Sequence, residues 1–137
     1  MEVLTFVWDG LATLMNDLLP YTTNSNFKYI ITGHSLGGAM ATLFSLLAKQ
    51  NAESNMWIHW DSCLITFGEN RLGNKAFADL HDEQISPNRK VRFVYNRDIV
   101  PHLPHKWQDF LHQSREVWLG REYVMHNNGA LSVIQVN

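Results

Sequence analysis

The sequence is short of cysteine, of net charge and of long apolar runs. It has one cysteine in 137 residues, Cys63, so no intrachain disulfide can form, and its place in the apolar run CLITF predicts a buried, inert thiol. The formal net charge is only -2, which gives no electrostatic reason to expect nucleic acid as a partner. With 45% hydrophobic and 18% charged residues the chain can bury a core, which argues against disorder.

No apolar run approaches the roughly 20 residues that a membrane span needs, so no transmembrane segment is expected. The N-terminus also lacks the basic start and the continuous apolar core of a secretory signal, because Glu2 comes first and Asp9 and Asp17 interrupt the apolar residues. The compartment is therefore unknown from the sequence.

The apolar residues of this N-terminal segment predict an amphipathic helix that packs on a core. They recur at steps of three and four, at Val3, Val7, Leu11, Leu14 and Leu18. Because the chain opens on such a helix with no strand before it, we expect the first strands of the fold to be missing.

Downstream, strand-like and helix-like segments alternate. Buried strands are expected at residues 26–33, 62–68 and 89–96, and shorter β-like pieces at 115–120 and 122–125. Helices are expected from Leu36 to about Lys49, with Leu43, Leu46 and Leu47 on one side, and over 75–84, capped by Asn74. This alternation predicts an α/β fold, with a largely parallel sheet and helices on both faces.

The pentapeptide GHSLG, residues 33–37, stands where the first predicted strand turns into a helix. It fits Gly-x-Ser-x-Gly, in which the turn strains the central residue and its neighbours at two removes must lack bulk. Ser35 would then expose its hydroxyl at a helix N-terminus, with the Leu36 N–H as a donor to an oxyanion. The alternative is a tight turn whose glycines serve packing only. The adjacent His34 is expected to pack beside Ser35 rather than to act as its base.

A carboxylate candidate follows the third predicted strand. Asp98 comes just after it, and Pro101 and Pro104 stiffen the loop beyond. Ligands of open α/β sheets bind at the carboxyl ends of the strands, and the order Ser then Asp is that of α/β-hydrolases. A turn or helix-capping role for Asp98 is the alternative.

Four segments, taken in order, resemble the class 3 (fungal-type) lipase family of the α/β-hydrolase superfamily: ITGHSLGGAMATL, LITFGENRLGN, FVYNRDIVPHLP and FLHQSREVWL. Together they span about residues 27–120. The resemblance implies that residues 1–137 are a single, partial α/β-hydrolase domain. It also implies a serine ester hydrolase of lipid metabolism, acting on acyl glycerols or related esters, and assigns the nucleophile to Ser35 and the orienting carboxylate to Asp98. No metal or organic cofactor is needed, and contact with a lipid interface is compatible with this activity.

The sequence departs from the family pattern in three places. Glu69 and Asn70 stand where the family more often has Gln-Pro, which alters a loop beside the site. The family's first oxyanion donor follows an early strand, and nothing before Tyr29 resembles it. The family's catalytic histidine lies in a segment like Asp-His-x-x-Tyr, which is absent here. His126 follows the last strand-like piece and is the candidate base on position alone. We therefore expect this chain alone to be a poor enzyme.

Three histidines, His102, His105 and His112, lie close together and raise the question of zinc. Zinc needs three or four converging ligands, whereas two of these flank a proline-stiffened loop, so we predict loop histidines and no metal. The competing function is a truncated or degenerate module that binds lipid or protein without turnover. Thioester or peptide cleavage is a weaker option, against which the run RDIVPHLP weighs.

Overall fold

The computed structural model describes residues 29–50, 62–113 and 115–120, together with residues 9–10, 13, 17, 124–125, 131–132 and 135–136. Of the predicted N-terminal helix only residues 9–10, 13 and 17 are described, and they are helical, whereas its apolar residues and His126 lie outside the described part. Among the helices that are described, none is long and apolar enough to cross a membrane.

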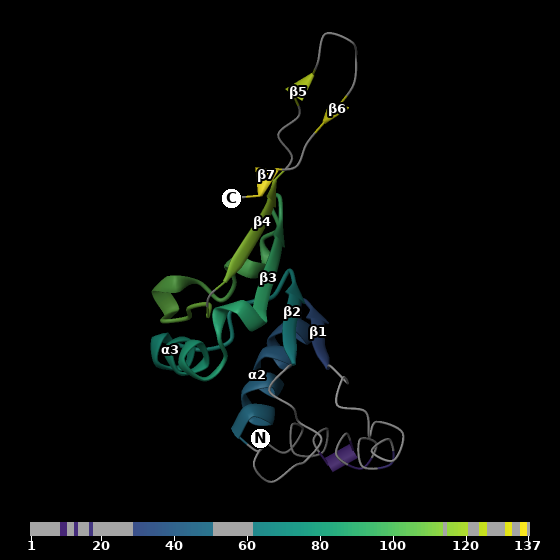
Figure 1. The fold of residues 1–137 in the computed structure, drawn as a ribbon. Coiled ribbons are helices and arrows are strands. Elements are labelled where there is room, and N and C mark those ends of the chain that lie inside the picture. The colour runs from purple at the N-terminus through teal and green to yellow at the C-terminus, as the bar shows by residue number, and fades with distance from the viewer. Residues whose placement is uncertain are drawn as a thin grey trace.

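Four parallel strands form the centre of the molecule (Figure 1). They are β1 (Ile30–His34), β2 (Cys63–Phe67), β3 (Lys90–Tyr95) and β4 (Glu116–Gly120). The sheet order is β1-β2-β3-β4-β7, in which the short β7 (Gln135–Val136) pairs antiparallel with β4. A separate antiparallel pair, β5 (Val124–Met125) and β6 (Leu131–Ser132), extends away from the sheet. The predicted parallel sheet is confirmed.

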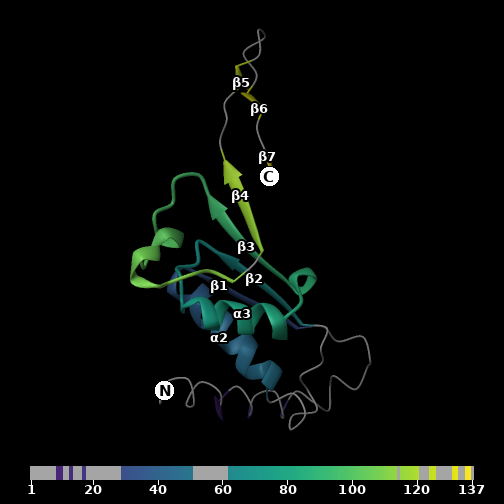
Figure 2. The same ribbon diagram turned by 90° about the vertical axis from the view of Figure 1, so that its left-hand side faces the viewer.

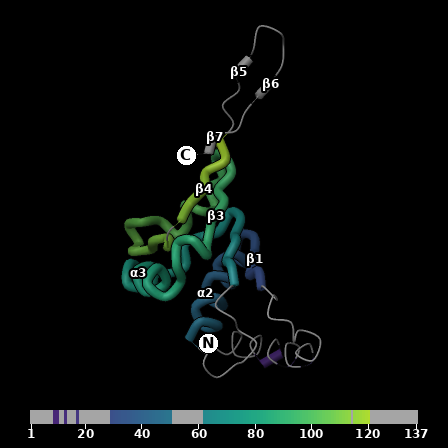
Figure 3. The backbone as a smooth tube through the Cα atoms, viewed as in Figure 1, coloured from purple at the N-terminus to yellow at the C-terminus, as the bar shows by residue number. Residues whose placement is uncertain are grey.

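Two helices, α2 (Leu36–Gln50) and α3 (Lys75–Gln84), cover the same face of this sheet (Figure 2). Three short 3-10 turns complete the described part: η2 (Pro87–Arg89), η3 (Val100–His102) and η4 (Lys106–Gln108). The loop that carries η3 and η4 lies beside the start of α3, where the Leu111 N–H donates to the Gly73 carbonyl at 2.8 Å (Figure 3). The described residues place no helix over the opposite face of the sheet, so the expectation of helices on both faces remains a prediction.

Small residues let α2 lie close to the sheet. Its buried positions include Ala39, Thr42 and Leu46, whereas Leu43 and Leu47 are only half-buried. Most of the fully buried positions of α2 are thus occupied by short side chains, with Leu46 the one leucine among them. Helix α3 begins as predicted, since the Asn74 side chain accepts a hydrogen bond from the Phe77 N–H at 3.1 Å.

The face of the sheet away from α2 and α3 is apolar. Phe67 and Phe93 stack on it from neighbouring strands, with ring centroids 5.4 Å apart. Cys63 and Ile65 lie on the same face and are half-buried. The prediction of a buried Cys63 is thus wrong, because alternation along β2 turns Leu64 and Thr66, not Cys63, toward the helices.

Backbone hydrogen bonds continue past the carboxyl ends of the strands. The Ser35 N–H donates to the Phe67 carbonyl at 3.0 Å, and the Gly68 N–H donates to the Phe93 carbonyl at 2.9 Å. The Asn96 N–H donates to the Leu119 carbonyl at 2.7 Å in the same way. The first residue after each of these strands is therefore hydrogen-bonded to the neighbouring strand, and the loop begins beyond it.

Candidate active site

Ser35 occupies the junction between β1 and α2 as a single residue of left-handed backbone. Its φ is 54°, a conformation that costs a residue other than glycine about 1–3 kcal/mol. The Ser35 carbonyl accepts hydrogen bonds from the N–H groups of Gly38, at 2.9 Å, and Ala39, at 3.3 Å, so it closes the first turn of the helix. This is the strand-to-helix geometry that GHSLG predicts.

The glycine two positions before Ser35 is required by a close backbone approach. A Cβ at Gly33 would lie 2.2 Å from the carbonyl oxygen of Gly37 and 2.7 Å from the Gly38 nitrogen. Both are backbone atoms, so no side-chain rotation could relieve the clash. The sharp turn that presents Ser35 therefore depends on a bare Cα at Gly33.

Leu36 is the first residue of α2, so its N–H belongs to the turn whose amides have no acceptor within the helix. The positive end of the helix dipole lies at the same place. An oxygen that develops negative charge beside Ser35 would therefore be stabilised by these amides. The Leu36 side chain itself is 66% exposed at this edge.

Asp98 lies just beyond the end of β3, in a turn with defined contacts. Its N–H donates to the Tyr95 carbonyl at 3.0 Å, and its Oδ1 accepts from the Val100 N–H at 2.9 Å. The turn begins at Asn96, which has a φ of 48° and whose carbonyl accepts from the Trp118 indole N–H at 2.9 Å. The Val100 N–H thus holds Oδ1 of the carboxylate, and Oδ2 has a different neighbour.

Oδ2 of Asp98 lies over Gly68, the residue that follows β2. A Cβ at Gly68 would be 2.8 Å from this oxygen and 3.5 Å from Nε2 of His34. Gly68 also has a φ of 55°, which glycine adopts without strain. The carboxylate therefore approaches the His34–Ser35 junction across the Cα of Gly68.

Ser35 and Asp98 accordingly lie at the same edge of the sheet, after β1 and β3, with β2 between them. Two strand spacings of about 4.8 Å separate the carboxyl ends of β1 and β3 by about 10 Å. His126, the predicted base, lies outside the described residues.

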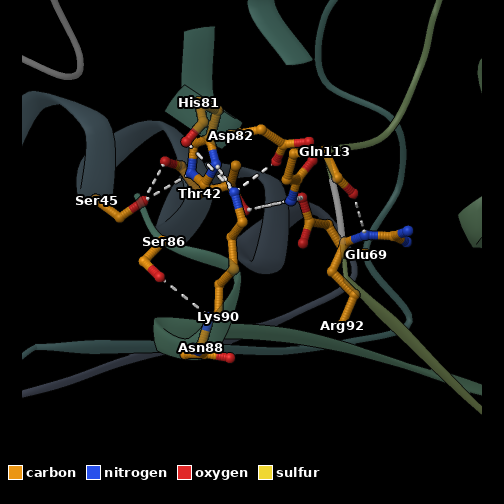
Figure 4. Close-up of polar contacts among 10 residues, drawn as sticks. All are labelled: Thr42, Ser45, Glu69, His81, Asp82, Ser86, Asn88, Lys90, Arg92 and Gln113. Atoms are coloured by element: carbon orange, nitrogen blue, oxygen red, sulfur yellow. Dashed lines mark hydrogen bonds and ion pairs between the residues drawn. The ribbon is translucent and has the colours of Figure 1, made fainter. Parts of the chain in front are cut away.

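A buried carboxylate, Glu69, lies on the helix side of the sheet just beyond the end of β2. Glu69 is 1% exposed and accepts hydrogen bonds from three side chains, of which Thr42 and Gln113 are drawn in Figure 4. Oε1 accepts from the Thr42 hydroxyl at 2.8 Å and the Gln113 amide at 2.9 Å, and Oε2 accepts from the Thr66 hydroxyl at 2.5 Å. Sequence reasoning noted Glu69 only as a loop difference. Its network links α2, the end of β2 and the segment before β4.

A second buried chain of polar groups joins the helices to the start of β3. The Lys90 ammonium lies 3.2 Å from Nδ1 of His81 and 2.5 Å from Oδ1 of Asp82, and Nε2 of His81 lies 3.1 Å from the Ser45 oxygen. Burial, followed by the nearby Lys90 charge, lowers the pKa of His81 to about 4. Burial also lowers the pKa of Lys90, against the opposing effect of Asp82. This cluster lies at the opposite edge of the sheet from Ser35.

The three histidines weighed as zinc ligands have different environments. His102 and His105 are exposed, while the half-buried His112 donates through Nε2 to the Pro101 carbonyl at 2.8 Å. Burial and the neighbouring Arg92 charge lower the pKa of His112 to about 3, so it is a neutral donor to the Asp98 loop. Within the described residues, no three His, Cys, Asp or Glu side chains gather as metal ligands would.

Comparisons with known proteins identify the family and the fold of this chain. A family model described as "Lipase (class 3)" matches residues 1–107. A lipase of Rhizomucor miehei is 38% identical over 113 residues, which cover 80% of this chain and 28% of that protein. The secreted mono- and diacylglycerol lipase 1 of Fusarium solani is 35% identical over 98 residues, 72% of this chain and 27% of that protein.

Among solved structures, a triacylglycerol lipase described as having a serine protease triad at its catalytic centre superposes with a TM-score of 0.64. It is 39% identical and is matched over 79% of this chain and 38% of its own. The chain thus spans less than a third of the two sequence relatives and less than half of the matched structure.

Proposed function

The chain belongs to the class 3 lipase family, and from that premise we propose that it carries the nucleophile and the orienting carboxylate of a lipase-type serine ester hydrolase. Its substrates would be acyl glycerols or related carboxylic esters, since the relatives are named as lipases of these compounds. The observation that carries the proposal is the left-handed Ser35 at the N-terminus of α2, with Asp98 at the same edge of the sheet.

In the proposed mechanism the Ser35 oxygen attacks the ester carbonyl while an imidazole accepts the hydroxyl proton. Asp98 orients that imidazole and stabilises its charged form, and the Leu36 N–H donates to the tetrahedral oxyanion. The imidazolium then protonates the departing alcohol, leaving Ser35 acylated. A water molecule, deprotonated by the same imidazole, releases the carboxylic acid. We propose His126 as this imidazole because it follows the last predicted strand-like piece, residues 122–125.

We also propose that this edge meets its substrate at a lipid surface. Leu36 and Ile99, which directly follow Ser35 and Asp98, are 66% and 64% exposed. Apolar side chains beside the reacting groups would contact the acyl chains of an aggregated ester. Replacing Ile99 with Gln should then lower the rate on emulsified long-chain esters more than on a dissolved short-chain ester.

The principal test combines ester turnover with a serine-reactive phosphonate. The full chain should form an adduct at Ser35, located by peptide mass spectrometry, and hydrolyse a short-chain chromogenic ester slowly, because nothing before Tyr29 resembles the first oxyanion donor of the family. Ser35→Ala should abolish the adduct and lower turnover by about 10⁴–10⁶-fold. Ser86→Ala, which changes an exposed serine at the start of η2, is the matched control and should retain both.

Residual turnover within tenfold of the parent in Ser35→Ala would exclude Ser35 as the nucleophile. A folded chain that neither reacts with the phosphonate nor hydrolyses esters would refute the hydrolase proposal and favour a module that binds without turnover.

A further inference from the structure

Two loops that follow neighbouring strands lie against each other: residues 68–73 after β2 and residues 98–104 after β3. We propose that Arg71, in the first loop, is a positioning residue that fixes the carboxylate of Asp98 in the second, with Gly68 leaving the space for that carboxylate. The inference rests on the proposed function, because it assigns a purpose to the precise placement of Asp98.

Arg71 binds three consecutive carbonyl groups of the Asp98 loop. Its Nη1 donates to the carbonyls of His102 and Pro104, the latter at 2.6 Å. Its backbone N–H donates to the intervening Leu103 carbonyl at 2.7 Å. The residue is only 7% exposed, so these contacts are shielded from water, and hydrogen bonds from a charged donor are stronger than neutral ones.

The short turn η3 connects the carbonyls that Arg71 binds to the carboxylate of Asp98. The Leu103 N–H donates to the Val100 carbonyl at 3.0 Å, and the Val100 N–H donates to Oδ1 of Asp98 at 2.9 Å. His112 holds the Pro101 carbonyl of the same turn from another side, at 2.8 Å. Moving the carbonyls that Arg71 binds would therefore move the amide that holds the carboxylate.

Gly68 sets how closely the Asp98 carboxylate can approach the end of β2. Its N–H is bonded to β3 through the Phe93 carbonyl, so its position is fixed by the sheet. Oδ2 of Asp98 lies 2.8 Å from the place where a Cβ would be, closer than a side chain at that position would allow. Gly68 thus determines how near the carboxylate approaches Ser35, and Arg71 holds the loop that carries Asp98.

The first measurement is amide hydrogen exchange, resolved by NMR, in the full chain. Arg71→Met should speed exchange of the Val100 N–H, the amide bonded to Asp98, by about tenfold or more, and Arg71→Lys should have a smaller effect. Amides in the middle of α2, such as that of Leu46, should be unchanged and so report that the variant is folded. Arg115→Met, which removes an exposed guanidinium far from this loop, is the matched control and should leave Val100 unchanged.

The second measurement is the kinetics of short-chain ester hydrolysis. Displacement of a positioned group by about 1 Å typically costs on the order of 10²-fold, so Arg71→Met should lower kcat by roughly ten- to a hundredfold with KM unchanged. Millimolar guanidinium ion should restore part of the kcat in that variant and none in Asp98→Asn. Gly68→Ala should lower kcat in the same way, with exchange in α2 unchanged.

Unchanged Val100 exchange in Arg71→Met would overturn the inference, as would faster exchange with full kcat. If the parent chain does not hydrolyse esters, the proposed function fails separately, and the exchange result alone decides. Faster exchange at Val100, with α2 unaffected, would still support Arg71 as the residue that holds the carboxylate.

Discussion

Lowering the pH from 7.5 to 4.5 should destabilise the folded chain through the buried ring of His81. The Lys90 ammonium can only donate, so Nδ1 of His81 accepts and the ring proton is on Nε2, which donates to the Ser45 oxygen. The Ser45 hydroxyl in turn donates to the Thr42 carbonyl at 2.7 Å. A second ring proton would have to bind at Nδ1 and would face the Lys90 ammonium. Because the His81 side chain is 0% exposed, no bulk water would screen the two charges.

The size and sign of the effect follow from the pKa of His81 in the two states. Burial and Lys90 lower the pKa to about 4 in the folded chain, against about 6.5 in the unfolded chain. Between these values the unfolded chain binds a proton that the folded chain does not, so stability falls as the pH falls. The contribution is complete above about pH 6.5 and is lost toward pH 4, by about 3 kcal/mol at 1.36 kcal/mol per pKa unit.

The assay is urea denaturation followed by tryptophan fluorescence at pH 7.5, 5.5 and 4.5. His81→Gln keeps a donor for Ser45 but cannot be protonated, so its free energy of unfolding should depend less steeply on pH than that of the parent. His102→Gln, at an exposed histidine, is the control and should follow the parent. His112, with its pKa lowered to about 3, adds a slope of the same sign in all three proteins. Equal slopes in the parent and His81→Gln would refute the reasoning.

Two further predictions concern the carboxylates near Ser35. In the proposed role of Asp98 an amide could not hold the imidazole in the required tautomer, so Asp98→Asn should lower kcat for a short-chain ester by about 10⁴-fold; an unchanged rate would move the orienting role to another residue. Glu69→Ala should lower the free energy of unfolding in urea by about 3 kcal/mol or more, since the hydroxyls of Thr42 and Thr66 and the amide of Gln113 lose a buried acceptor worth about 1–3 kcal/mol each. A loss below about 1 kcal/mol would show that water or rearrangement satisfies these donors.

The features that the sequence predicts well are those fixed by local sterics. GHSLG predicts a strained serine between two glycines because the turn itself forces that geometry, and Ser35 has the expected positive φ. Asn74 predicts a helix start because its side chain bonds an amide three residues on. The parallel sheet is likewise predicted by the alternation of strands and helices.

The features that sequence reasoning missed depend on contacts between distant segments. Glu69 and Gln113 lie 44 positions apart, and nothing local to either residue indicates that one accepts from the other. The sequence shows Arg71 only as a cation in a loop, because the three carbonyls that it binds belong to a distant segment. Cys63 was expected to be buried because its run is apolar, but the run does not show which face of the sheet is covered.

The hydrogen bonds that extend the sheet past its strand ends bear on how the proposed ester hydrolysis would be lost on heating. Ser35, Gly68 and Asn96 are each bonded to a neighbouring strand, so the edge that carries Ser35 and Asp98 cannot separate while the strands remain paired. Such an edge belongs to the most cooperative part of the molecule rather than to a flexible loop. Thermal inactivation should therefore coincide with melting of the sheet, and substitutions that stabilise the core should extend the working temperature by the same amount.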